Sequence, residues 1–255
     1  MDNLIARAFE FYNDFRDDKK ILIYQMGKVG STTIENSIPE SLHLHTLYQN
    51  SPCWIHQKMR RPGFVGQFVI KVGDFIKRTA IKRRKKVKIV TMVREPVSRN
   101  ISMFFQNLPY WYVHYVNTSK FDIREGGIEF LKDVFDESYD HQYQFQWFDK
   151  EIKRLTGIDI FTKNYDPQKG YLKIVKGKYE LFLFRLEDME KALPALTEFT
   201  GNDIALEEKN LGSQKWYACL YSDLKKIILN DENYREKMVN TEFAKFFSYV
   251  KAGKK

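Results

Sequence analysis

The chain has 255 residues, of which 43% are hydrophobic and 15% aromatic, and its formal net charge is +9. This length and apolar content suffice for one domain with a substantial core, and they exclude an intrinsically disordered protein. No run reaches the ~18 apolar residues that a membrane-spanning helix needs. We therefore expect a single domain over residues 1–255.

The first expected element is an amphipathic helix over residues 1–20, with apolar side chains along one side. This segment lacks the apolar core of a secretory signal peptide. The two cysteines, Cys53 and Cys219, lie far apart in the sequence, so neither has a partner at metal-ligand spacing. Both observations favour a reducing compartment, and we expect the protein in the cytoplasm.

A buried strand expected over 21–26 leads into a glycine loop and a helix expected over 30–38. Gly27 and Gly30 allow the backbone to approach a phosphate closely, and Lys28 adds a mobile positive charge. The unpaired N–H groups at a helix start also attract anions. Hydroxyl donors then follow: Ser31, Thr32 and Thr33. The segment predicts a cradle for a phosphate or phosphosulfate group.

This loop differs from that of nucleoside triphosphatases, whose motif is G-x-x-x-x-G-K-[ST]. Here the lysine lies between the two glycines, and the four-residue spacer is absent. A second interpretation stays open, in which the glycines only relieve crowding at a strand-to-helix turn.

A short strand near 42–46 and a helix over about 63–80 precede the strongest basic cluster, residues 82–88. Three interpretations of this cluster compete: a solvated surface, attraction of an anionic substrate, and a nucleic-acid patch. We favour the solvated surface, because no aromatic residues flank the run and the sequence shows no nucleic-acid-binding fold.

Another strand, expected over 87–93, ends at Arg94, and a helix over 96–107 follows it. Ser98 and Ser102 are four residues apart, so they share one face of this helix near Arg94. An arginine fork with serine hydroxyls close by suits the oxygens of a phosphate.

The remaining pattern predicts a mainly helical insertion and a helical C-terminus. The insertion spans 108–160, with helices near 127–135 and 139–155; a strand or hairpin follows at 171–184, then helices at 189–200, about 214–229 and 240–249. Strands that alternate with helices predict an α/β fold with a central parallel sheet flanked by helices. Ligands of such sheets bind beyond the carboxyl ends of the strands, where both phosphate motifs fall.

Together the two motifs resemble those of sulfotransferases that use 3'-phosphoadenosine 5'-phosphosulfate (PAPS) as donor. The family loop is similar to Gly27-Lys28-Val29-Gly30-Ser31-Thr32, although many members have proline in place of Gly27. The family arginine, with a serine eight residues later, is similar to Arg94 and Ser102. The resemblance implies a P-loop-like three-layer fold in which the loop, through Thr33, holds the 5'-phosphosulfate while Arg94 and Ser102 hold the 3'-phosphate.

Later segments extend the resemblance over most of the chain. Residues 185–189, Arg-Leu-Glu-Asp-Met, are similar to a family turn that follows a late strand. Asn210 and the Lys215-Trp216-Tyr217 triplet are similar to a bacterial group of capsular polysaccharide synthesis proteins with a sulfotransferase-like fold. Residues 147–151 and 157–159 also resemble that group.

The resemblance implies transfer of a sulfuryl group from PAPS to a hydroxyl or amine of a glycan-like acceptor, without a metal ion. It assigns Lys28 to neutralising charge on the leaving group, and the backbone N–H groups of residues 30–33 to the 5'-phosphate. The chemistry resembles phosphoryl transfer, in which positioning and charge neutralisation dominate.

The acceptor needs a general base within hydrogen-bond reach. His43 and His45 alternate on the short strand, so they share one face of it beside the cradle. His45 lies nearer the carboxyl end and is our first candidate, and His141 is the second. Glu35 and Asp74 stay open as alternatives.

Two aromatic segments each have two interpretations. Trp216 and Tyr217 belong to the core, or Lys215 and Asn210 close over the donor while Trp216 stacks near its adenine or sugar. The run 110–112, Tyr-Trp-Tyr, forms a wall of the acceptor cleft or packs in the interior.

Two other function classes remain open on the sequence. A nucleotide-dependent kinase or phosphotransferase would use the same loop for phosphates and would depend on magnesium. A non-catalytic protein that binds anions or nucleic acid would retain the fold without the chemistry.

Overall fold

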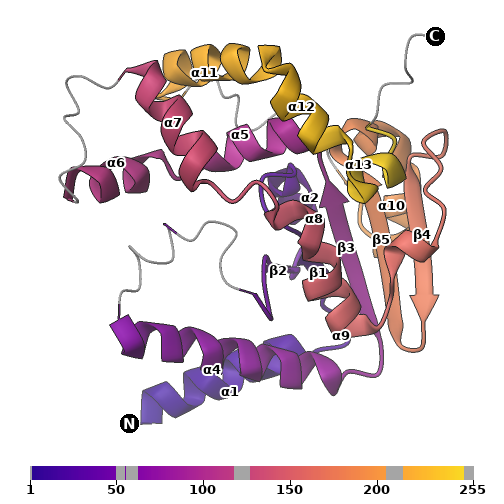
Figure 1. Cartoon of the computed structure of the whole chain (residues 1–255). Coiled ribbons are helices and arrows are strands. Elements are labelled where there is room, and N and C mark those ends of the chain that lie inside the picture. Colours follow the sequence, from indigo (N-terminus) through magenta and orange to yellow (C-terminus); the bar gives the residue numbers. More distant parts are fainter. Residues whose placement is uncertain (1, 50–54, 56–62, 118–126, 205–214, 250–255) are drawn as a thin grey trace.

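The computed structural model describes residues 2–49, 55, 63–117, 127–204 and 215–249. Within them, a five-stranded sheet in the order β2-β1-β3-β5-β4 lies among helices (Figure 1). The strands are β1 (Leu22–Tyr24), β2 (Leu42–Leu44), β3 (Val87–Val93), β4 (Tyr171–Lys176) and β5 (Tyr179–Arg185). All neighbouring pairs are parallel except β4 with β5. The expected α/β fold with a mainly parallel sheet is confirmed.

The centre of the sheet is β3, which is buried at six of its seven positions. Helices cover both faces of the sheet (Figure 1), so β3 is apolar at consecutive positions rather than at alternate ones. It pairs with β5 from Val87 to Val93, and β1 pairs with it through Leu22 and Ile23. This parallel register places the carboxyl ends of β1, β3 and β5 at one edge of the sheet.

The helices of the first half of the chain are α1 (Asp2–Arg16), α2 (Ser31–Ser37), α4 (Gly63–Lys82) and α5 (Pro96–Gln106). Figure 1 shows α1 and α4 crossing at one end of the molecule, while α5 follows the carboxyl end of β3. The start of α5 is well capped, because the Glu95 carboxylate accepts hydrogen bonds from the N–H groups of Val97 (2.9 Å) and Ser98 (2.7 Å). Pro96 occupies the first turn, where its missing N–H leaves no bond unmade.

Helices continue through the region expected to be a helical insertion. They are α6 (Leu108–Asn117), α7 (Ile128–Ser138), α8 (Tyr143–Trp147), the π-helix η1 (Phe148–Lys153), α9 (Arg154–Thr156) and the 3₁₀ turn η2 (Ile160–Thr162). The helix predicted near 139–155 is therefore present as an uninterrupted helical run from Tyr143 to Thr156, and its middle part is π-helical.

After β5 the chain is again helical, with η3 (Leu186–Asp188), α10 (Met189–Thr200), α11 (Ala218–Asn230), α12 (Glu232–Val239) and α13 (Glu242–Phe246). The predicted helix over 214–229 begins later, at Ala218. No described helix is long and apolar enough to cross a membrane.

The buried side chains form two clusters. The first surrounds the sheet, and the second lies among α5, α6, α7, α11 and α12, with Phe104, Trp111 and Phe135 fully buried in it. Because α5 follows β3 directly and belongs to the second cluster, it joins that cluster to the carboxyl edge of the sheet.

Candidate functional site

The loop between β1 and α2 has an unusual backbone. Gly27, Lys28 and Gly30 all adopt left-handed conformations, with φ angles of 83°, 63° and 86°. A Cβ atom at Gly27 would lie 2.8 Å from Met103 Cε, and one at Gly30 would lie 2.5 Å from Leu186 Cδ1. Both glycines are thus favoured by the left-handed backbone, and a side chain at either would displace the end of a neighbouring side chain. Lys28 holds a conformation that L-residues rarely adopt.

Arg99 of α5 fixes the backbone of this loop through hydrogen bonds. Its side chain is fully buried, and it donates hydrogen bonds to the carbonyl oxygens of Met26 (2.9 Å) and Gly27 (3.3 Å). It also donates to the Tyr139 hydroxyl (3.1 Å) and lies 5.3 Å from the centroid of the Tyr143 ring. Arg99 was not predicted as a site residue, although its spacing of four from Met103 places it on the buried face of α5.

Positive charges converge on the loop. Burial lowers the pKa of Lys28 to about 8, and repulsion from neighbouring cations adds to the effect. In order of influence these cations are Lys215, Arg94 and Arg99. No carboxylate offsets them among the groups that shift this pKa, so the cluster is suited to an anion. The predicted residues Lys28, Arg94 and Lys215 are therefore brought together by the fold.

Tyr217, two residues after Lys215, packs against α5, and this contact positions Lys215 near the loop. The ring of Tyr217 lies 5.4 Å from that of Phe105, and Lys215 Nζ lies 5.7 Å from the Tyr217 centroid. Trp216 is 71% exposed, so it is not the core residue that one interpretation expected. Asn210 lies outside the described residues.

The other residues of the predicted donor site differ in accessibility. Thr32 is exposed, whereas the Val29 side chain is fully buried, so Val29 offers only its backbone to a ligand. The side chains of Ser31 and Thr33 lie outside the described part of the structure. Ser102 is half-buried two turns into α5, and no described contact joins it to Arg94.

His45 lies beside the loop, just after β2. Its Nδ1 is 3.0 Å from the Gln25 carbonyl oxygen, and a Cβ atom at Gly27 would lie 3.7 Å from its Cε1. Although the residue is exposed overall, protein groups crowd the ring on several sides, and this desolvation together with nearby His43 lowers the pKa of His45 to about 4. With Nδ1–H donating to Gln25, the neutral ring keeps an acceptor lone pair on Nε2.

The remaining candidates for a general base lie elsewhere or serve other contacts. The His141 ring contacts the Phe135 carbonyl oxygen through Nε2 (2.7 Å) and the Tyr234 hydroxyl through Nδ1 (2.9 Å). Both of its nitrogens are thus used inside the second cluster. Glu35 lies 3.2 Å from His43, and Asp74 lies 3.0 Å from Lys77 on α4.

The turn after β5 completes the edge of the site. Glu187 accepts hydrogen bonds from the Glu95 N–H (2.8 Å) and the Tyr249 hydroxyl (2.9 Å). Leu186 packs against Gly30, and Arg185 donates to the carbonyl oxygen of Phe247 (2.8 Å). The Arg-Leu-Glu-Asp-Met turn therefore joins the loop, the start of α5 and the C-terminal segment.

The aromatic run before α7 is mostly structural. Trp111 is fully buried and stacks on Phe104 at 5.8 Å, while Tyr112 lies 6.0 Å from Phe130. The interpretation of Trp111 as a wall of an acceptor cleft is therefore wrong, because the second cluster encloses its ring.

Comparisons with known proteins identify one family. Its description is "Putative capsular polysaccharide synthesis protein", and it matches residues 118–248, just over half of the chain. The matched part includes Lys215 and the turn after β5, and it begins after the glycine loop and Arg94. Comparisons with curated proteins and with solved structures find no match. The chain belongs to this capsular polysaccharide synthesis family.

Proposed function

We propose that the protein is a sulfotransferase that moves a sulfuryl group from PAPS to a hydroxyl or amine of a glycan-like acceptor. The observation that carries the proposal is the set of cations around Lys28. Lys215, Arg94 and Arg99 all lower the pKa of this lysine, and no carboxylate raises it. A donor with a phosphosulfate and a second phosphate brings several negative charges to such a site. The family description adds a role in glycan biosynthesis.

In this proposal each residue of the site has a role that follows from its position. Lys28 faces the bridging oxygen on which negative charge develops as its bond to sulfur breaks. Arg94, Ser102 and Lys215 hold the phosphates, and the backbone of residues 27–33 cradles the phosphosulfate. Arg99 acts through the loop, because it holds the carbonyl groups of Met26 and Gly27 in place.

His45 serves as the general base. Its neutral Nε2 accepts the proton of the acceptor hydroxyl as the acceptor oxygen bonds to sulfur, and 3',5'-adenosine bisphosphate is the other product. Because the pKa of His45 is about 4, the ring is unprotonated at neutral pH and holds a free lone pair, but it is a weaker base than an ordinary histidine. The reaction written in this way balances without a metal ion.

Calorimetric titration tests the donor site. We expect 3',5'-adenosine bisphosphate to bind at least about tenfold more tightly than 5'-AMP, because the second phosphate meets Arg94. Lys215→Gln should weaken this binding, while Lys163→Gln, a change at an exposed lysine after η2, should leave it unchanged. Equal affinity for the two nucleotides would refute the proposal, and preference for ATP with magnesium would assign the site to phosphoryl transfer.

A further inference from the structure

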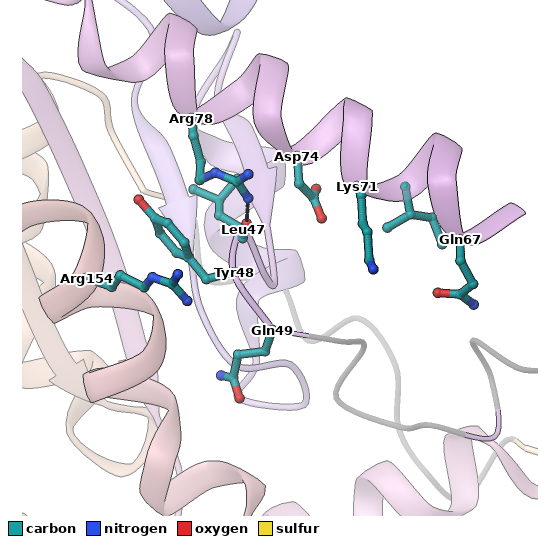
Figure 2. A pocket seen from close by; sticks show the side chains of 9 residues that line it. Leu47, Tyr48, Gln49, Gln67, Lys71, Asp74, Arg78 and Arg154 are labelled. Atoms are coloured by element: carbon teal, nitrogen blue, oxygen red, sulfur yellow. Dashed lines mark hydrogen bonds between the residues drawn. The ribbon is translucent and has the colours of Figure 1, made fainter. Parts of the chain in front are cut away.

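The segment that follows His45 lines a pocket of its own. A pocket of about 340 Å³ opens between α4, α9 and residues 47–49 (Figure 2). None of the residues that line it belongs to the cationic cluster around Lys28. Since residues 47–49 follow His45 by only a few positions, the pocket adjoins the proposed general base along the chain.

A buried carboxylate shapes the wall of this pocket. Glu151 of η1 accepts hydrogen bonds from the backbone N–H groups of Leu47 (2.8 Å), Tyr48 (3.2 Å) and Gln49 (2.7 Å). Arg78 of α4 donates to the Leu47 carbonyl oxygen (Figure 2). The 47–49 segment is therefore fixed from two sides, which keeps the side chains of Tyr48 and Gln49 in place.

The pocket carries an excess of positive charge. Tyr48 lies between two guanidinium groups, with Arg78 at 5.0 Å and Arg154 at 4.6 Å from its ring centroid (Figure 2). Lys71 is a third cation of the lining, and Asp74, its one carboxylate, is already paired with Lys77. Within the described part of the chain, neither Arg154 nor Lys71 has a carboxylate partner.

Gln49 also brings a side-chain amide to the pocket, whereas the Tyr48 hydroxyl points away from Lys71 and Gln67 (Figure 2). An amide both donates and accepts hydrogen bonds, so it suits a ligand with hydroxyl groups. A nucleobase would not stack on Tyr48, because arginines occupy both faces of its ring.

We propose that this pocket binds a negatively charged sugar, carboxylated or phosphorylated, of the glycan acceptor. The assignment of this sugar to an acceptor rests on the proposed function, but the binding site itself does not. The guanidinium of Arg154 and the ammonium of Lys71 attract the anionic group, and the Gln49 amide receives the hydroxyls.

Binding of defined saccharides tests the site. We expect hyaluronan hexasaccharide or maltose 1-phosphate to bind, and the neutral chitohexaose and maltose to bind at least about tenfold more weakly. Arg154→Gln and Lys71→Gln should each weaken binding of the anionic saccharide about tenfold, since each removes one charged contact from an exposed side chain. The control Lys163→Gln should not, and neither pocket variant should change binding of 3',5'-adenosine bisphosphate.

The outcomes separate the two proposals. Failure of both anionic saccharides to bind, or equal binding by Arg154→Gln and the wild type, would overturn the pocket assignment. Saccharide binding that depends on Arg154, without any binding of 3',5'-adenosine bisphosphate, would support the pocket and refute the sulfotransferase.

A different observation concerns the outer side of α4. Large apolar side chains are exposed along it: Phe64 (85%), Val65 (73%), Phe68 (58%), Val69 (49%), Val72 (39%) and Phe75 (62%). At 100° per residue these positions form one continuous stripe, which is far more apolar than an ordinary helix surface.

The charges near this stripe indicate what covers it. The one acidic residue of α4, Asp74, is paired with Lys77 and lines the pocket rather than the stripe. The helix ends at Lys82, and two exposed basic residues, Arg83 and Lys85, follow, while Lys86 is paired with Glu180 (2.7 Å). We infer that α4 lies on an anionic lipid surface, with its stripe in the headgroup region and this basic end at the lipid charges.

Vesicle sedimentation tests the lipid assignment. The protein should bind phosphatidylcholine vesicles that contain phosphatidylglycerol, and bind pure phosphatidylcholine at least about tenfold more weakly. The triple variant Phe64→Ser, Phe68→Ser, Phe75→Ser should lose binding, whereas Val175→Ser, a change at an exposed valine of β4, should keep it. Absence of vesicle binding, or a dimer of the wild type that the triple variant abolishes, would overturn the assignment.

Discussion

Lys28 combines a left-handed backbone with a pKa lowered to about 8, so its charge state is unusually sensitive to a bound anion. The charged lysine is disfavoured in the free protein by burial and by neighbouring cations. A bound phosphosulfate would offset that repulsion and raise the pKa again. The free and bound proteins therefore differ in the protons they hold above about pH 8.

This linkage predicts a pH dependence of donor binding. The affinity for 3',5'-adenosine bisphosphate should be constant from about pH 7 to the pKa of Lys28 near 8, and should fall by up to about tenfold per pH unit above it. Lys28→Arg should remove this fall, because a guanidinium stays charged over the same range. Calorimetry across the range checks this, and an identical decline in Lys28→Arg would exclude Lys28 as its source.

His45 makes a second residue-level prediction, which needs no acceptor. The ring should titrate near pH 4 in NMR spectra of the folded protein, because burial and His43 disfavour its charged form. Since the unfolded ring titrates near 6.5, His45 should lower stability as the pH falls from about 6.5 to about 4. A midpoint between about 6 and 7 would mean an ordinary, solvated imidazole, and His45→Gln identifies the resonance.

At the scale of elements, Gly30 shows why the strand, loop and helix fit together. Its backbone is left-handed, and a Cβ atom would meet Leu186 of the turn after β5. Gly201, at the end of α10, has a similar φ angle of 75° but open space around it. A comparison of substitutions at Gly30 and Gly201 therefore separates the cost of a left-handed backbone from the cost of the contact with Leu186.

We expect Gly201→Ala to lower the free energy of unfolding by about 1 kcal/mol, the ordinary cost of a left-handed alanine. Gly30→Ala should lower it by about 2–4 kcal/mol, because Leu186 must also move. Only the Gly30 variant should lose affinity for 3',5'-adenosine bisphosphate. Urea denaturation measures both, and equal losses of stability would show that Leu186 yields without strain.

The elements that the sequence pattern predicts are those with a strong apolar signal. β3 was predicted over 87–93 and occupies Val87–Val93, because six of its seven positions are apolar or β-branched, as suits a strand buried on both faces. α12 was missed, since Glu232–Val239 is mostly polar and buries one side chain, Met238. α6 was missed because Pro109 falls in its first turn, where a proline is tolerated.

The parts of the site that could be predicted are those formed by a short, contiguous sequence motif. The glycine loop and Arg94 each follow a strand, so parallel packing brings them to one edge of the sheet. The approach of Lys215 depends on how Tyr217 packs on Phe105, which no spacing in the sequence reveals. Arg99 and Glu151 escaped notice because buried charges are rare, and only the three-dimensional contacts explain them.

At the scale of the whole molecule, the proposed donor site gathers three segments that are distant in the sequence. The first is the loop at Lys28, the second is the β3–α5 junction at Arg94, and the third precedes α11 at Lys215. α5 contacts the loop through Arg99 and α11 through Phe105. A donor that touches all three segments should therefore restrain both buried clusters at once.

Hydrogen exchange measures this coupling directly. Adding 3',5'-adenosine bisphosphate should slow amide exchange in residues 24–34, 92–100 and 215–221 together, because binding to the folded state opposes local opening in each. Lys215→Gln should remove the protection of the third segment more than that of the other two, while Lys163→Gln should leave all three protected. Protection confined to the first two segments in the wild type would mean that Lys215 lies near the donor without binding it. In that case the acceptor rather than the donor would neutralise Lys215, since a sulfated or carboxylated sugar beside Lys28 would meet its unpaired positive charge.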